Sequence, residues 1–221
     1  MSIASKILDL LFPPRCLFCS ALLPEENGEA LCSACREQEK DLVKTIRRKG
    51  AEFTLCVSPL VYDGPVREAM LRYKFSGSRS KARGFAPYLA RTISEELGGK
   101  FDTVTYVPTH PLRVFSRGFD QSRLLAKEVC RIWQVRPETL LKKQRYNKAN
   151  SSLQGSARRR ANVLGAYRPV KNARIQGKRI LLIDDIITTG STLSECARVL
   201  LDAGAETVYC ATLAATEKKE D

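Results

Sequence analysis

Hydrophobic residues in the C-terminal part of the chain form a short continuous run, Ile180–Ile183, with polar residues directly after it. Four adjacent aliphatic residues are typical of a strand buried on both faces, and we expect this strand to end where Asp184 and Asp185 follow. The apolar residues beyond the turn recur at helical spacing and stop before Gly204: Leu193, Ala197, Leu200 and Leu201. The segment therefore predicts a strand, a turn and a helix.

The same reading of the rest of the chain predicts an alternation of strands and helices. Apolar runs at 55–62, 104–107 and 207–213 predict three further strands. Helical spacing predicts a helix that begins near Pro65, and two more at about 82–97 and 121–133. Such alternation is typical of an α/β domain built on a parallel sheet, whose functional side chains gather at the carboxyl ends of the strands.

The predicted turn after the aspartates carries hydroxyl side chains around one glycine: Thr188, Thr189, Gly190, Ser191 and Thr192. Free N–H groups and the dipole at a helix start favour an anion, and glycine lets the backbone approach a phosphate closely. Asp184 and Asp185 would repel that phosphate, but they suit sugar hydroxyls or a metal carried with the ligand. The pattern indicates a ribose 5-phosphate site, with an ordinary strand and helix capped by Ser191 or Thr192 as the alternative.

Four of the eight cysteines form two closely spaced pairs near the N-terminus: Cys16, Cys19, Cys32 and Cys35. Two Cys-x2-Cys knuckles can bring four thiolates together as a tetrahedron, the arrangement that structural Zn²⁺ prefers. A redox or disulfide role is the alternative. The other cysteines are scattered in apolar contexts and are expected in the core: Cys56, Cys130, Cys196 and Cys210.

These features divide the chain into a zinc module with flanking helices at 1–50 and an α/β domain at 51–221. One of the helices is expected to start in the second knuckle and to run towards Arg48, because Leu42, Val43 and Ile46 make an apolar stripe. A length of 221 residues suits one sizeable α/β domain with a small appendage.

The net charge of +13 is placed unevenly. Residues 1–50 hold 8 Lys and Arg against 7 Asp and Glu, whereas residues 51–221 hold 29 against 17. The segment 142–179 contains basic residues, two tyrosines and no acid. It suits either a groove for single-stranded nucleic acid or a basic hood over substrate phosphates, and a solubilising surface is the plainer alternative.

No stretch approaches the roughly 18 uninterrupted apolar residues that a membrane helix needs. The N-terminal stretch, Met1–Phe12, is amphipathic and lacks a small-residue cleavage site, which argues against a signal peptide. We therefore expect a cytoplasmic protein without a transmembrane segment, with recruitment to the inner face of the membrane by partners as an option.

A second polar stretch follows the strand predicted at 104–107. It contains Arg113 and Arg117, four residues apart, whose guanidinium groups suit a pyrophosphate. His110 is the only histidine, so a histidine-based triad or a histidine-rich metal site is excluded, and a hydrogen-bonding role is expected for it.

Taken together, these motifs resemble a known family. The run from Ile183 to Gly190 resembles the signature of type I phosphoribosyltransferases, which bind phosphoribosyl pyrophosphate (PRPP). Its combination with the two Cys-x2-Cys pairs and with Val107-Pro108-x-His110-x2-Arg113-x3-Arg117-Gly118-Phe119-Asp120-Gln121 resembles the ComF family of competence-associated proteins. The resemblance covers nearly the whole chain, and one departure is Asp120, where the family usually has Asn.

The resemblance implies a fold, a ligand and partners. It implies a type I phosphoribosyltransferase-like parallel sheet flanked by helices, behind a small zinc-ribbon-like module. PRPP would bind with Mg²⁺: the 188–192 turn would hold the 5-phosphate, Asp184 and Asp185 would contact the ribose as catalytic residues, and Arg113 and Arg117 would receive pyrophosphate.

Three functions follow from this resemblance. The chain is an active phosphoribosyltransferase with an unidentified acceptor, a PRPP-binding protein that binds single-stranded DNA with the DNA-uptake machinery, or a PRPP-linked regulator without a DNA role. The family is associated with DNA uptake in natural transformation, which favours the second.

Overall fold

The computed structural model describes residues 13–24, 30–75, 79–147 and 156–217. The N-terminal stretch considered as a signal peptide and part of the basic segment 142–179 lie outside these ranges. Within them, no helix combines the length and the apolarity that crossing a bilayer requires.

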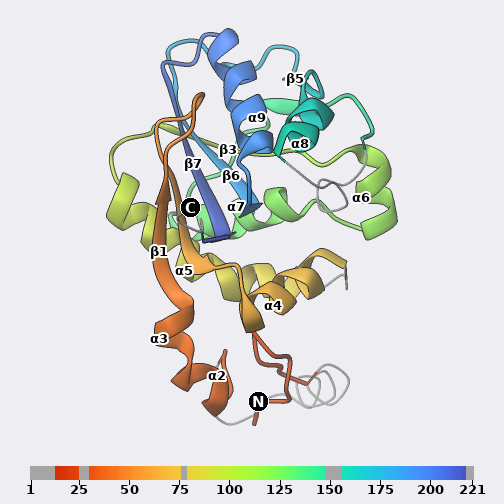
Figure 1. Ribbon diagram of the computed structural model, residues 1–221. Coiled ribbons are helices and arrows are strands. Elements are labelled where there is room, and N and C mark those ends of the chain that lie inside the picture. The colour runs from red at the N-terminus through yellow and green to blue at the C-terminus, as the bar shows by residue number, and fades with distance from the viewer. Residues whose placement is uncertain (1–12, 25–29, 76–78, 148–155, 218–221) are drawn as a thin grey trace.

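A five-stranded sheet forms the centre of the molecule, in the order β1-β2-β7-β6-β3 (Figure 1). Strands β2 (Cys56–Val61), β7 (Thr207–Ala215), β6 (Arg179–Ile187) and β3 (Thr103–Tyr106) run parallel to one another, and β1 (Val43–Arg48) is antiparallel at one edge. The predicted parallel sheet is confirmed, and the antiparallel edge strand is an addition to it.

The run at the start of β6 is apolar throughout because each face of the sheet is covered. Leu181 and Ile183 belong to a core with helices α4 (Gly64–Phe75), α5 (Arg79–Leu97) and α7 (Gln121–Ile132). Ile180 and Leu182 belong to the core on the other face, beneath α9 (Ser191–Asp202). All four side chains are fully buried, as expected for alternate residues that point to opposite covered faces.

A smaller unit lies over the face covered by α9. It consists of a two-stranded antiparallel sheet of β4 (Leu141–Lys143) and β5 (Tyr167–Pro169), with α8 (Ser156–Val163) between them in sequence (Figure 1). We call residues 141–147 and 156–169 the hood. A short helix, α6 (Pro111–Arg117), follows β3.

Two sequence-based predictions were wrong. The helix expected to run towards Arg48 is two short helices, α2 (Ser33–Glu37) and α3 (Glu39–Leu42), after which the chain enters β1. The strand β6 does not end before the aspartates but continues to Ile187, because it keeps pairing with β7 along this whole length. The predicted boundary at residue 50 stays a prediction, with β1 and β2 paired across it.

Candidate functional site

A cavity of about 380 Å³ lies at the carboxyl ends of β3 and β6. All the residues predicted to bind the ligand line it: Arg113, Arg117, Asp184, Asp185, Thr188, Thr189, Gly190, Ser191 and Thr192. This is the position at which open parallel sheets bind ligands, because the turns that follow the strands meet there.

The two aspartates are held on β6 in different environments. Asp184 Oδ1 accepts hydrogen bonds from Ser122 Oγ at 2.7 Å and from the backbone N–H of Asp185 at 2.9 Å. Asp185 Oδ2 lies 3.3 Å from Lys74 Nζ, and its Oδ1 accepts from the N–H of Ile186 at 2.8 Å. Both carboxylates therefore have fixed orientations before any ligand arrives.

Burial governs the charge of this pair. Asp184 and Asp185 are only 8% and 9% exposed. Burial, followed by the adjacent charge of Asp185, raises the pKa of Asp184 to about 7. The charge of Asp185 raises the pKa of Lys74, so this lysine stays a cation beside the pair.

The turn after β6 leads into α9 without a side-chain cap. Gly190 is the N-cap of α9 with φ +78°, a left-handed conformation that glycine adopts at little cost, and no side chain caps the helix there. The expected alternative cap, Ser191 or Thr192, is therefore wrong, and the phosphate-binding role of the turn stays a prediction. The hydroxyls of Thr189 and Ser191 lie 3.0 Å apart at the start of α9, where the helix dipole favours an anion.

The two arginines reach the cavity from α6. They lie one turn apart on this helix, and both line the cavity. Arg113 donates to the carbonyl of Asn147 in the hood and lies with its guanidinium 5.3 Å from the centre of the Tyr146 ring. His110 caps α6 by accepting from the N–H of Leu112 at 3.3 Å, which agrees with the hydrogen-bonding role expected for it.

Asp120 has a capping role that uses both oxygens of its carboxylate. One of its oxygens accepts from the N–H of Arg123 at 3.1 Å at the start of α7, and the other accepts from the N–H of Thr109 at 2.7 Å. Both contacts require acceptors only. Burial raises the pKa of Asp120, and the two backbone donors oppose that shift.

Sequence reasoning did not assign several other cavity residues to the site, and five polar ones matter here: Lys74, Ser122, Lys143, Arg159 and Tyr167. Lys74 and Ser122 lie on helices whose apolar spacing says nothing about a site. The other three belong to the hood, and Lys143 Nζ donates to the hydroxyl of Tyr167 at 3.2 Å. The basic segment 142–179 predicted cations near the site, but it did not predict which of them line the cavity.

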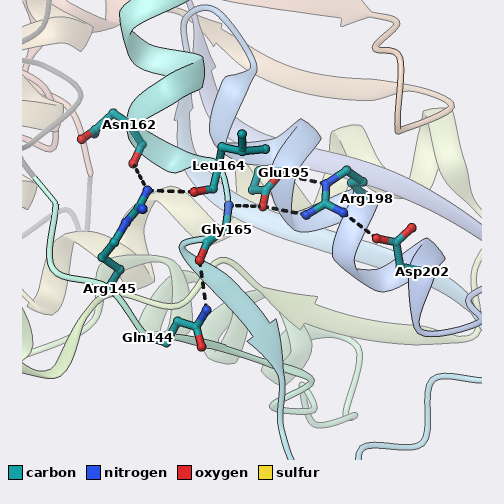
Figure 2. A network of polar contacts seen from close by, with 8 residues as sticks. All are labelled: Gln144, Arg145, Asn162, Leu164, Gly165, Glu195, Arg198 and Asp202. Carbon is teal, nitrogen blue, oxygen red and sulfur yellow. Dashed lines mark hydrogen bonds and ion pairs between the residues drawn. The ribbon is translucent and has the colours of Figure 1, made fainter.

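Some residues of the basic segment line the cavity, and others are exposed or hold the hood together. Arg159 is half-buried and lines the cavity, whereas its neighbours Arg158 and Arg160 are exposed. Arg145 donates to the carbonyls of Asn162 at 3.3 Å and Leu164 at 2.8 Å, at the end of α8 (Figure 2). Much of the segment is thus used to build and line the hood.

A polar network joins the hood to α9 (Figure 2). Glu195 Oε1 accepts from the N–H of Gly165 at 2.7 Å, and Arg198 Nη2 donates to the same oxygen at 2.9 Å. Arg198 also pairs with Asp202 at 2.5 Å. Because α9 begins at the 188–192 turn, this network fixes α8 and Arg159 relative to that end of the cavity.

The four N-terminal cysteines form a second site. The sulfur atoms of Cys16, Cys19, Cys32 and Cys35 all lie within 4.8 Å of one another. A tetrahedral zinc with Zn–S bonds of about 2.3 Å needs sulfurs about 3.8 Å apart, so this arrangement fits structural Zn²⁺. A set of four thiolates leaves no open position, which excludes a catalytic role for the metal in such a site.

The zinc module packs on the larger domain. Phe18, between the two cysteines of the first knuckle, lies 6.3 Å from the ring of Phe85 on α5. Lys81 donates to the carbonyl of Leu17 at 2.9 Å. A Cβ at Gly84 would lie 2.8 Å from a methyl carbon of Leu17, so the glycine permits this close contact. The module therefore shares the core that includes α4, α5 and α7.

Comparisons with known proteins identify the two kinds of domain in the chain. Residues 116–221 match the phosphoribosyl transferase domain, and residues 7–46 match the double zinc ribbon domain. The DNA utilization protein YhgH of Escherichia coli O6:H1 is 32% identical over 202 residues, which cover 86% of this chain and 82% of that protein.

Two further likenesses are more partial. Competence protein ComFC of Bacillus subtilis is 29% identical over 148 residues, which cover 66% of this chain and 58% of that protein. The solved glutamine PRPP amidotransferase from B. subtilis, complexed with ADP and GMP, is 22% identical over 64% of this chain and 30% of its own, with a TM-score of 0.43. That structural likeness is too loose to carry an inference. The near full-length relation to YhgH, with both domains in the same chain, shows that the protein belongs to the ComF family of ComFC and YhgH.

Proposed function

We propose that the cavity binds PRPP with Mg²⁺ and that the protein serves DNA utilization as a PRPP-binding protein that contacts single-stranded DNA. The observation that carries the ligand is the meeting, in one cavity, of an anion-binding turn, a buried acidic pair and two arginines. A ribose that carries a 5-phosphate and a pyrophosphate needs these three kinds of contact.

Each group has a role in this proposal. The 188–192 turn holds the 5-phosphate through backbone N–H groups and hydroxyls. Asp184 and Asp185 accept hydrogen bonds from the ribose hydroxyls, and Arg113 and Arg117 receive the pyrophosphate. Mg²⁺ prefers carboxylate and phosphate oxygens, so Asp184 and Asp185 would help to hold the ion that PRPP carries, and the ion would offset negative charge.

Catalysis of transfer is a second candidate. Transfer needs stabilisation of the departing pyrophosphate and of a cationic sugar carbon, and the cavity offers cations for the first and carboxylates for the second. The acceptor is then a small molecule, and Arg159 in the hood helps to cover it. In either case the zinc module stabilises the fold, and we place the protein in the cytoplasm.

The test compares PRPP binding in the presence of Mg²⁺ by the wild type and by Asp184→Asn/Asp185→Asn. The double variant keeps the oxygen acceptors that Ser122 uses but removes both charges, and we expect it to lose PRPP binding by at least about tenfold. Glu206→Gln is the control, because Glu206 is exposed and does not line the cavity. This variant should bind PRPP as the wild type does.

Two results would contradict the proposal or decide between its forms. Equal PRPP affinity of wild type and double variant would show that the acidic pair does not hold the ligand. Release of pyrophosphate by the wild type with any acceptor, abolished in the double variant, would establish the enzyme. For the DNA role, failure of the wild type to bind single-stranded DNA at low salt would contradict it.

A further inference from the structure

A second cavity, of about 530 Å³, is lined by residues of α7 and of the segment that follows this helix. Its lining is strongly basic and includes Arg123, Lys127 and Arg131 of α7 and Arg136 from the segment that follows. None of its lining residues is acidic, and it shares no lining residue with the first cavity. We call it the α7 groove.

The helix itself explains why the cations gather there. Its apolar side chains, Leu125, Ala126 and Val129, are fully buried against the sheet. Arg123, Lys127 and Arg131 recur every four residues on the outward face of the helix, about 6 Å apart. After the helix the chain turns back, and the N–H of Glu138 donates to the carbonyl of Val104 at 2.8 Å, which covers the edge of the sheet and closes the far wall.

Among the described residues, one of the four groove cations is paired with an acid, and the other three are not. Arg131 pairs with Glu128 at 2.9 Å. In the described part of the chain, no ion pair joins Arg123, Lys127 or Arg136 to a carboxylate. All three are exposed, so they are available to an external polyanion.

The extent of the groove indicates an extended ligand. Eight residues along α7 span about 12 Å, which is too long for a single phosphate group. A concave surface suits a chain lodged within it, whereas a bilayer would need a flatter face with large apolar side chains. Val135 is the large exposed apolar residue in the lining, at 52%. A phosphodiester strand matches this combination of charge and shape.

We propose that the α7 groove binds the backbone of single-stranded nucleic acid. This inference rests on the proposed DNA role and moves its contact surface from the hood to α7. The strand contacts would be sequence-independent, since the groove offers cations and no exposed ring. The first turn of α7 contributes Gln121 and Ser122 to the first cavity, so a strand in the groove lies beside the proposed PRPP site.

The experiment measures binding of a fluorescent single-stranded oligonucleotide of mixed sequence by anisotropy, across a salt series. The groove variant carries Arg123→Gln, Lys127→Gln and Arg136→Gln. The matched hood variant carries Arg158→Gln, Arg160→Gln and Arg168→Gln, which are equally exposed and remove the same charge. Thermal unfolding confirms that both variants are folded.

The groove variant should lose affinity by roughly ten- to a hundredfold, and its slope of log affinity against log salt should fall by about 2. The hood variant should lose far less. A larger loss in the hood variant, or equal losses in both, would overturn the groove assignment while leaving the DNA role intact. Absence of binding by the wild type would overturn both. Displacement of the oligonucleotide by poly-glutamate as readily as by unlabelled strand would identify an acidic polypeptide surface and also overturn the inference.

Discussion

The ammonium group of Lys74 lies 3.3 Å from the carboxylate of Asp185, at a point where α4 meets the carboxyl end of β6. The lysine side chain is 26% exposed and the aspartate side chain 12%. Lys74 thus supplies one positive charge to the two adjacent buried acids, Asp184 and Asp185. Without it, the acidic pair would carry uncompensated charge in the absence of ligand.

Lys74→Met should therefore lower the free energy of unfolding by about 2 kcal/mol near pH 8, since methionine keeps the packing and removes the charge. Urea unfolding measures this. Lys44→Met is the control, because Lys44 pairs with Glu217 at 3.1 Å on an exposed surface and should change stability by less than about 1 kcal/mol. Equal effects of the two substitutions would show that the Lys74 pair has no special weight.

The raised pKa of Asp184 predicts a pH dependence. Between about pH 4 and about pH 7, the folded protein holds a proton on Asp184 that the unfolded chain has already released. Stability from this group therefore falls as pH rises through that window and is level above it. Asp184→Asn keeps the acceptor for Ser122 and removes the titration. In urea unfolding without ligand, the variant should gain on the wild type from pH 5 to pH 7, and a constant difference would contradict the shifted pKa.

The network that joins the hood to α9 gives a matched pair of substitutions. Glu195→Ala removes the acceptor of the Gly165 N–H and should cost about 1–3 kcal/mol. It should also weaken PRPP binding, because Arg159 loses its fixed position over the cavity. Asp202→Ala removes the exposed partner of the same Arg198 and should alter neither by a measurable amount. Unchanged PRPP affinity in Glu195→Ala would mean that the network serves stability alone.

Zinc should be present at one equivalent per chain in freshly purified, reduced protein, measured by atomic absorption. Cys19→Ser should lower this content and the melting temperature, because the module contributes Phe18 to the core against α5. Cys130→Ser is the control for metal content, since Cys130 is buried away from the cluster and should leave one equivalent bound. Substantially less than one equivalent in the wild type would contradict the four-cysteine zinc site.

Local patterns in the sequence predicted the parts of the fold that local chemistry decides. The aliphatic run of β6 reflects burial on both faces of the sheet. The two Cys-x2-Cys spacings predicted that Cys16, Cys19, Cys32 and Cys35 would lie close together, as they do. The turn and the helix after it were also predicted, because a glycine among small polar residues marks the end of a strand. The binding of a phosphate by this turn stays a prediction.

Features that depend on contacts between residues far apart in the sequence could not be predicted from local patterns. Residues 43–48 have an apolar spacing that fits a helix, yet their pairing with β2 makes them a strand. Asp184 disfavours a strand by itself, but it is held in β6 opposite Thr212 of β7. Lys74 and Arg159 reach the cavity only through the packing of α4 and the hood. The sequence shows that both are charged, but it does not show that their side chains point to the cavity.

The most direct test of the account is a calorimetric titration of the zinc-loaded protein with PRPP and Mg²⁺, with ribose 5-phosphate and pyrophosphate titrated separately. If the 188–192 turn, the aspartates and the arginines act on one ligand, PRPP should bind at one site per chain, and it should bind more tightly than either fragment by at least about tenfold. Each fragment should compete with PRPP. No heat of binding with PRPP, or binding no tighter than that of ribose 5-phosphate alone, would contradict the assignment of this cavity to PRPP.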